Sequence, residues 1–351
     1  MYDYMTTCGE YSGWQFVWLV SRDFASPDLP GVTFIRQPAS NWGFDYYRYL
    51  YHVYTSKYLF CTHSHFAEAN PRRQVSVCLW HGTMLKRICA MNEREKDQPK
   101  KDQFRYFVAP SEFYVDFFCK SFLCGREQVL VTGYPRIDFL LQESDVLSSL
   151  GIKRTEFDKI IVYMPTFRKP VGGGYSDAGV GVQSSIDIDN PDTVARLSAF
   201  LQQNRCLMII KWHPVDVRRS SCIKAENIVA VSDELLAKRR LTVYHLLHEA
   251  DALITDYSSV FCDYLILDRP IAFDIADMES YAEKRGFVFD KPLDYMPGMK
   301  LRSEMDFMAF CRDLIEGRDI YRAERERVRT VFNDFSDGRN SRRLATRLKI
   351  L

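Results

Sequence analysis

The stretch that decides the fold is ALITDYSSVF, residues 252–261. Its first four residues are apolar or β-branched and predict a buried strand, and residues 259–267 predict a helix. Small polar side chains occupy the turn between them. This step from strand through polar turn to helix is typical of open α/β sheets, in which ligands bind beyond the carboxyl ends of the strands.

The polar turn offers groups that suit an anion. A helix start presents unpaired N–H groups and a partial positive charge, and the hydroxyls of Ser258 and Ser259 add donors. Together they would form a phosphate site without a glycine-rich loop. The alternative is ordinary helix capping by Asp256 or a serine. This stretch alone fits both interpretations.

The same step recurs through the second half of the chain. Apolar runs predict strands at residues 160–164, 207–210, 228–231, 252–255 and 271–273, with helices at 192–203, 243–248 and 259–267. Thr166 and Arg168 follow the first of these strands, and we expect them at the same sheet edge as Ser258. Arginine can bond two phosphate oxygens at once, although a surface salt bridge is the alternative. Arg285 marks a later turn that would border this edge.

The first half alternates in the same way, which predicts mostly parallel sheets covered on both faces. Strands are expected at residues 15–20, 32–35, 58–62, 75–80, 107–109 and 129–131. The helix expected at residues 2–7 has no strand before it, which indicates either an N-terminally shortened chain or a sheet that begins one strand late. We predict one domain at residues 1–145, a second at 146–320, and a basic helical segment at 321–351.

Two histidines each end an apolar run and begin a turn. His81 follows Leu79 and Trp80, and His213 follows residues 209–212, about 130 residues later. A histidine at a strand end can donate to an anion or accept a proton near neutral pH. The pair therefore predicts a cleft between two sheets.

Composition excludes several classes of protein. The chain has 351 residues, 46% hydrophobic and 26% charged, which suits two globular cores. A net charge of +1 gives no general case for nucleic-acid binding. No apolar run reaches the roughly 18–20 residues that span a bilayer. The N-terminus does not look like a signal peptide, so we expect a cytoplasmic protein.

The ten cysteines include no C-x-x-C pair, so we expect free thiols in a reducing compartment. Asp187 and Asp189 have the D-x-D spacing of metal-dependent glycosyltransferases, but they precede a helix, which favours capping. His63 and His65 are a weak metal signal without a nearby carboxylate or cysteine. We expect no metal site and no requirement for a divalent metal.

The segment from residue 319 onward is rich in arginine. A solvated helical face would account for it. The alternative is contact with an anionic membrane surface or polymer.

In order along the chain, these segments resemble the CDP-glycerol glycerophosphotransferase family, which includes teichoic-acid glycerol phosphate primases and polymerases and related capsule polymerases. The first 75 residues match only in general character. The matching motifs are WHGT at 80–83 with Lys86, TGYPRID at 132–138, PTFR at 165–168, WHP at 212–214, TDYSSV at 255–260, LDRPI at 267–271, RGF at 285–287 and PG at 297–298.

The resemblance implies a GT-B fold, with two Rossmann-like domains facing across a cleft and a C-terminal helix packed back on the first. It also implies a reaction. Glycerol phosphate passes from CDP-glycerol to a hydroxyl of a glycan, glycolipid or polyol-phosphate acceptor, CMP leaves, and no cofactor is tightly bound. Family members commonly carry an additional N-terminal membrane-binding region that these residues do not match. The basic segment is then the expected peripheral contact with the inner face of the cytoplasmic membrane.

The resemblance also assigns roles to residues. It implies that His81 is the general base for the acceptor hydroxyl and that His213 donates to the diphosphate. The phosphates and nucleotide would be held by Thr166, Arg168, Thr255, Ser258, Ser259 and Arg285. The acceptor side or structural support would involve Gly82, Thr83, Lys86, Arg136 and Asp256, the last by shaping its turn.

Two alternatives stay open. The same scaffold could use another CDP-alditol or a nucleotide sugar. A non-catalytic subunit that binds polymer is also conceivable, although it should have lost active-site residues and both histidines are present. The acceptor, the number of units added and the oligomeric state do not follow from the sequence.

Overall fold

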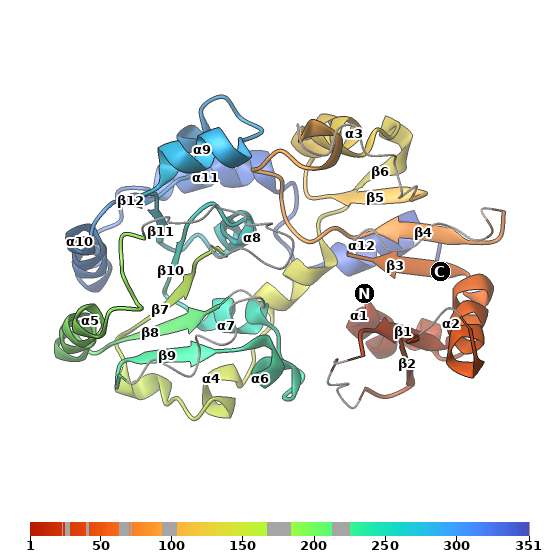
Figure 1. Cartoon of the computed structure of the whole chain (residues 1–351), viewed down its shortest axis with the longest axis horizontal. Helices are drawn as coiled ribbons and strands as arrows, with labels where there is room; N and C mark the ends of the chain where they lie inside the picture. Colours follow the sequence, from red (N-terminus) through yellow and green to blue (C-terminus); the bar gives the residue numbers. More distant parts are fainter. Residues whose placement is uncertain are drawn as a thin grey trace. The chain divides into compact units, whose positions relative to one another are not determined.

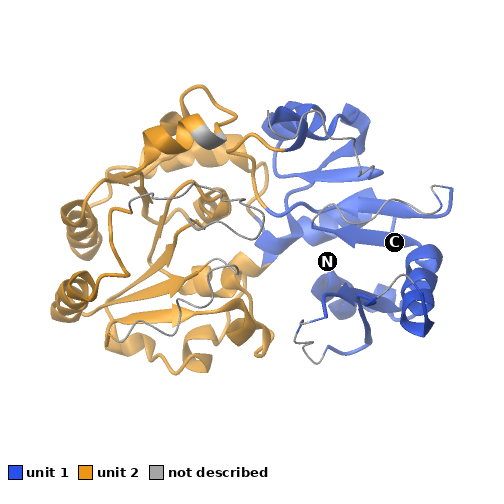
Figure 2. Cartoon of the chain, in the orientation of Figure 1, with its two compact units in different colours: residues 1–81, 89–138, 337–351 blue, residues 82–88, 139–336 orange. Residues whose placement is uncertain are grey.

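The computed structural model in Figure 1 describes residues 1–22, 24, 29–39, 42–62, 70, 72–92, 104–166, 184–212 and 225–350. The chain forms two compact units, coloured separately in Figure 2. Unit 1 comprises Met1–His81, Cys89–Asp138 and Asp337–Leu351, and unit 2 comprises Gly82–Ile88 and Phe139–Ser336. Both units are therefore assembled from segments that are distant in the sequence.

The described part of unit 2 contains a six-stranded sheet whose neighbouring strands are all parallel. Its order is β12-β11-β10-β7-β8-β9, which reverses direction between β7 and β10 (Figure 1). This is the doubly wound order, and such a reversal is where α/β sheets bind ligands. The strands are β7 (Lys159–Met164), β8 (Cys206–Lys211), β9 (Ile228–Val231), β10 (Ala252–Thr255), β11 (Ile271–Asp274) and β12 (Met299–Leu301).

Strands covered on both faces need continuous apolar runs, and β8 and β10 are buried at every position. The helices α5 and α10 pack against one side of this sheet through side chains spaced three or four apart, such as Leu197 and Leu201. The helices of unit 2 are α4 (Val146–Ser149), α5 (Pro191–Gln203), α6 (Asp233–Ala237), α7 (Val243–Glu249), α8 (Val260–Tyr264), α9 (Met278–Arg285), α10 (Glu304–Ile315) and α11 (Arg322–Phe332).

The described part of unit 1 contains two parallel sheets. Strands β3 (Tyr58–Cys61), β4 (Val75–Cys78), β5 (Tyr106–Ala109) and β6 (Val129–Val131) pair in sequence order. Strands β1 (Phe16–Val20) and β2 (Val32–Arg36) form a separate pair. The first two predicted strands thus do not extend the main sheet. The helices of unit 1 are α1 (Tyr2–Thr7), α2 (Phe44–Thr55), α3 (Val115–Phe122) and α12 (Asn340–Arg347).

The last helix, α12, is part of unit 1. The Asp138 carboxylate accepts hydrogen bonds from the backbone N–H groups of Asn340 and Ser341, both at 2.8 Å. This places a carboxylate at the positive end of the helix. Arg343 donates to the Thr132 carbonyl at 3.2 Å. The C-terminal helix therefore returns to the first half of the chain.

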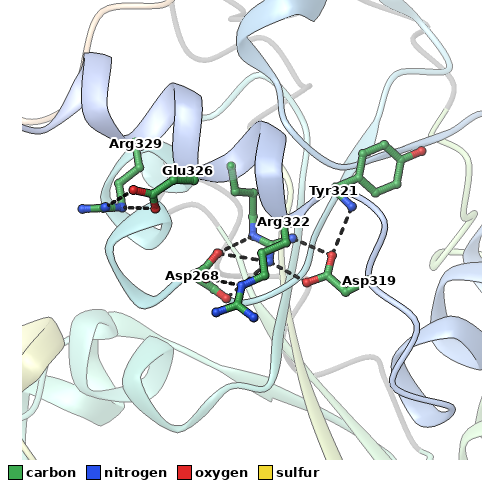
Figure 3. A network of polar contacts seen from close by, with 7 residues as sticks. Asp268, Asp319, Tyr321, Arg322, Glu326 and Arg329 are labelled. Atoms are coloured by element: carbon green, nitrogen blue, oxygen red, sulfur yellow. Dashed lines mark hydrogen bonds and ion pairs between the residues drawn. The ribbon is translucent and has the colours of Figure 1, made fainter.

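Helix α11 is held in unit 2 by ion pairs, which Figure 3 shows. Arg325, with a 1% exposed side chain, bonds Asp319 at 2.6 Å and Asp268 at 3.2 Å. Arg322 also pairs with Asp268, at 3.1 Å. These arginines neutralise carboxylates of their own unit. The basic segment thus consists of two helices in different units. In α11, the charges of Arg322 and Arg325 hold the helix within unit 2.

Other expectations concern cysteines and membrane spans. The nine cysteines among the described residues are free thiols, as predicted. Within the described ranges, no helix is both long and apolar enough to cross a membrane.

Candidate functional site

The carboxyl ends of β7 and β10 meet where the strand order of unit 2 reverses. Thr255 donates its hydroxyl to the Met164 carbonyl at 2.6 Å. The Asp256 carboxylate, which is wholly buried, accepts from both the backbone N–H and the hydroxyl of Thr166, each at 2.7 Å. Thr255 and Asp256 therefore join the two strand ends, and Thr166 is fixed at the edge of the sheet.

The two serines of the turn are placed differently. Ser258 and Ser259 are both half-buried. Ser259 occupies the N-cap position of α8, but its side chain makes no capping bond, and Asp256 faces Thr166 instead. Helix capping, the alternative use of this stretch, is therefore not observed. Within the described residues neither serine hydroxyl has a hydrogen-bond partner, so both are available to a ligand.

The segment Gly82–Ile88 belongs to unit 2 and packs beside Ser259. A Cβ atom at Gly82 would lie 2.1 Å from the Ser259 hydroxyl oxygen and 3.1 Å from its Cβ, so any side chain here would displace Ser259 or the segment itself. Thr83 is 3% exposed, and no described residue bonds its hydroxyl. Gly82, assigned above to the acceptor side or to support, is thus a neighbour of Ser259, and Thr83 follows it in the chain.

Residues after Gly82 are attached to the chain that follows α9. Lys86 forms an antiparallel bridge with Phe287, and Val288 donates to the Leu85 carbonyl at 2.9 Å. The Lys86 ammonium lies 5.5 Å from the centre of the Tyr281 ring, within cation–π range. These contacts fix Lys86 within unit 2. Arg285 ends α9, and its side chain lies outside the described part of the structure.

Two aromatic residues complete this region. The rings of Tyr257 and Tyr281 lie 4.1 Å apart, and the Tyr257 hydroxyl donates to Asp277 at 2.9 Å. No sequence pattern assigned a role to either tyrosine or to Asp277. Tyr257 lies within residues 252–261, and this position was the sequence signal that could have identified it.

Asp274, at the end of β11, is a second unselected residue. Its carboxylate accepts from the Ser185 backbone N–H at 2.9 Å and from the Ser184 hydroxyl. The Tyr163 hydroxyl approaches the same carboxylate at 3.5 Å. A carboxylate that ends an apolar strand was the sequence signal for this contact.

His81 lies in unit 1, beyond the carboxyl end of β4, and its side chain is exposed. Its Nδ1 is 3.0 Å from the Thr62 carbonyl oxygen. Because a carbonyl oxygen only accepts, Nδ1 must carry the proton, and Nε2 keeps its lone pair in the neutral ring. This is the tautomer that a general base needs.

Neighbouring residues support the loop that carries His81. The Trp80 ring lies 4.0 Å from the imidazole, and the Trp80 backbone is left-handed, with φ 52°. Arg136 donates to the Trp80 carbonyl at 3.3 Å and lies 3.8 Å from the Tyr134 ring centre. Arg136 thus supports the His81 loop from the turn after β6.

Two predicted site residues, Arg168 and His213, lie outside the described residues. Hydrogen bonds and an ion pair hold the residues just before His213 in place. Lys211 is 4% exposed, and its ammonium donates to the Trp212 carbonyl and to the Asp233 carboxylate, both at 2.8 Å. This fixes the end of β8 at the same sheet edge as Thr166.

The two aspartates with D-x-D spacing, Asp187 and Asp189, do not cap the helix as expected. Asp187 accepts from the backbone of Asp189 at 3.2 Å, while Asn190 caps α5 by accepting from the Asp192 N–H at 2.9 Å. The cap is therefore the asparagine and neither aspartate. No group of potential metal ligands is found among the described residues. His63 and His65 lie outside them.

Comparisons with known proteins agree on one family. A sequence model described as CDP-Glycerol:Poly(glycerophosphate) glycerophosphotransferase matches residues 1–349. The Teichoic acid poly(glycerol phosphate) polymerase of Bacillus subtilis is 27% identical over 318 residues, covering 83% of this chain and 38% of that protein. The Teichoic acid ribitol-phosphate primase of Bacillus spizizenii is 23% identical over 315 residues, covering 84% of this chain and 75% of that protein. The chain thus spans well under half of the first relative.

A solved structure shares the fold. The Wall Teichoic Acid Polymerase TagF superposes with a TM-score of 0.75 at 22% identity, covering 99% of this chain and 83% of that chain. The expected α/β, GT-B-type fold is confirmed by this likeness.

Proposed function

Because the chain belongs to the CDP-glycerol:poly(glycerophosphate) glycerophosphotransferase family, we propose that it transfers glycerol phosphate from CDP-glycerol to a hydroxyl of a teichoic-acid-type polyol-phosphate acceptor. The acceptor oxygen attacks the β-phosphorus and forms a new P–O bond. The bond from that phosphorus to the bridging oxygen breaks, and its electron pair leaves with CMP. The proton of the acceptor hydroxyl passes to a base on the protein.

The observation that carries this proposal is the 3.0 Å contact between His81 Nδ1 and the Thr62 carbonyl oxygen. With Nδ1–H held by this carbonyl, the neutral ring keeps a lone pair on Nε2 that can take the acceptor proton. The same carbonyl then stabilises the imidazolium that forms. A base of this kind typically contributes about 10²–10⁴-fold to the rate.

The phosphates of the donor are assigned to the turn at the strand-order reversal. Ser258, Ser259 and the buried hydroxyl of Thr83 supply donors without competing internal partners among the described residues. Phosphoryl transfer depends mainly on positioning and on stabilising charge, and these hydroxyls can position the phosphates and stabilise their charge by hydrogen bonding. Gly82 supports this assignment within unit 2, because a Cβ atom built there would lie 2.1 Å from the Ser259 hydroxyl oxygen.

The remaining assignments rest on the sequence. His213 donates to the diphosphate, and Arg168 and Arg285 bind phosphate or nucleotide. Thr166 stays at the edge of this site, while Thr255 and Asp256 hold the strand ends. We also propose that the enzyme needs no divalent metal and works at the cytoplasmic face of the membrane.

A ribitol phosphate donor is the second candidate, because a ribitol-phosphate primase is among the relatives. A donor screen that measures CMP release decides between CDP-glycerol and CDP-ribitol. We expect release from CDP-glycerol in the presence of a glycerol phosphate acceptor, with and without EDTA. Faster release from CDP-ribitol would reassign the donor.

The test of the mechanism is His81→Ala. We expect kcat to fall about 10²–10⁴-fold, with the KM for CDP-glycerol nearly unchanged. The matched control is His52→Ala, since His52 lies in α2 and not in the loop that follows β4. Full activity in His81→Ala would refute the assignment of the base.

A further inference from the structure

Unit 1 contains a basic groove that the proposed chemistry does not use. It has a volume of about 1050 Å³ and runs along β6, the last strand of the four-stranded sheet. Helix α12 forms one wall, and the residues around α3 form another. We call it the β6 groove. Its basic lining residues are Arg126, Arg339, Arg342, Arg343, Arg347 and Lys349.

The charge of the β6 groove is largely uncompensated. Its lining carries six basic side chains and two carboxylates, Glu112 and Glu127, which leaves a net charge of +4 among the described residues. Arg126 pairs with Glu112, and Arg343 pairs with Asp337 at 2.8 Å. The other four cations make no ion pair with any described residue. They are therefore available to an anionic ligand.

The helix aims these cations in one direction. Residues 339, 342, 343, 346 and 347 are spaced three or four apart, so they share one face of α12. Leu344 and Ala345 are buried on the opposite face. The Asp138 carboxylate at the start of the helix fixes its orientation. Packing therefore holds α12 with its basic face toward the groove. Helix α11 differs, because its Arg325 faces carboxylates of its own unit.

The shape of the groove indicates the ligand. Its volume far exceeds that of one phosphate group, and valines of β6 and α3 contribute apolar surface between the cations. In a polyol-phosphate chain, charged phosphates alternate with short carbon units, which matches cations separated by apolar surface. A bilayer presents a broad surface that does not enter a hollow of this kind. We propose that the β6 groove binds the phosphodiester chain of the acceptor polymer, an inference that rests on the proposed function.

The test uses the whole chain and a short fluorescently labelled glycerol phosphate oligomer, without donor. In the variant Arg342→Gln/Arg347→Gln we expect about tenfold weaker oligomer binding and a shallower salt dependence, because fewer phosphate counterions are released. The matched control is Arg72→Gln/Lys120→Gln, which removes the same charge from exposed residues of unit 1 outside the groove. Arg339→Gln/Lys349→Gln provides a second groove variant if the first does not fold.

Binding of the same variants to vesicles of anionic phospholipid is measured in parallel. The proposal requires that the groove variants weaken oligomer binding while the control does not. Unchanged oligomer binding would overturn it, and so would a loss confined to vesicle binding, which would assign the groove to membrane lipid. A wild-type chain that binds oligomer but releases no CMP from any donor would refute the proposed function and leave the groove intact.

Discussion

At the scale of single residues, Gly82 is the position in the proposed site at which one added carbon would meet a phosphate-binding hydroxyl. A methyl group there would meet the Ser259 hydroxyl at 2.1 Å. In Gly82→Ala, either Ser259 must rotate or the segment Gly82–Ile88 must shift. We expect kcat/KM for CDP-glycerol to fall about 10–100-fold, since small displacements at a reacting centre have effects of this size.

The control for this substitution is Gly13→Ala, because a Cβ at Gly13 would meet no atom within 4 Å. Steady-state kinetics and a thermal unfolding curve separate an effect on the site from an effect on the fold. Wild-type kinetics in Gly82→Ala would contradict the placement of Ser259 at the donor phosphates.

Residue-level prediction from the sequence identified the turn at residues 255–259 but not its partners. Asp256 was expected to shape its turn, and its carboxylate accepts from Thr166, which lies 90 residues earlier at the end of a neighbouring strand. The contact of Gly82 with Ser259 joins residues far apart in the sequence, so no local pattern indicates it. The tautomer of His81 depends on the Thr62 carbonyl, which belongs to another strand end.

At the scale of elements, α11 depends on one buried cation. Replacing Arg325 with methionine would leave the carboxylates of Asp268 and Asp319 without their main partner. We expect Arg325→Met to lower the free energy of unfolding by about 2–3 kcal/mol, less than for a wholly buried pair because both carboxylates are partly solvated. Urea denaturation measures the loss.

The same network predicts a dependence on pH. The hydrogen bond from Arg325 lowers the pKa of Asp319. The pair therefore stabilises the fold fully above the unfolded pKa of about 3.9, and this contribution is lost as the pH falls through the lower folded pKa. We expect Arg325→Met to flatten the acid limb of the stability curve.

The control is Arg318→Met, whose arginine pairs with Asp313 on the surface and should contribute less than about 1 kcal/mol. Equal losses in both variants would argue against the special importance of the buried Arg325.

Element prediction from the sequence was best for the buried strands of unit 2. The run at residues 252–255 matches β10, and the run at 160–164 lies within β7. Strand β12 was missed because it is three residues long and contains a lysine. The basic segment was expected to be one helical unit. It divides near Gly338, whose φ of 67° is left-handed, and Asn333 is anchored to the Cys262 carbonyl at 2.8 Å.

At the scale of the whole molecule, the two units exchange segments of chain. A linear reading of the sequence places one boundary near residue 145. The structure adds Gly82–Ile88 to unit 2 and Asp337–Leu351 to unit 1. Both additions rest on contacts between distant residues, and local apolar periodicity does not record such contacts.

The closure of unit 1 by its two chain ends gives a further prediction. Ile350 is 4% exposed and packs in one cluster with Met5 and Tyr11. Ile350→Asp would bury a charge there, and we expect it to destabilise unit 1 by about 3 kcal/mol. Hydrogen exchange should then speed up in β3 to β6 and stay slow in β8 and β10.

Ile320→Asp is the matched control, because Ile320 is 83% exposed and should tolerate the charge within about 0.5 kcal/mol. Equal acceleration of exchange in both units after Ile350→Asp would show that they unfold together.

The interleaved units also have a consequence for synthesis on the ribosome. Unit 1 starts first, yet its last segment, Asp337–Leu351, emerges after Ser336 has completed unit 2. Met5 and Tyr11 must wait for Ile350, so their apolar surface stays uncovered until residue 350 has been made. Unit 1 is therefore begun before unit 2 and completes its packing after unit 2, and it is the unit that most needs protection by chaperones during translation.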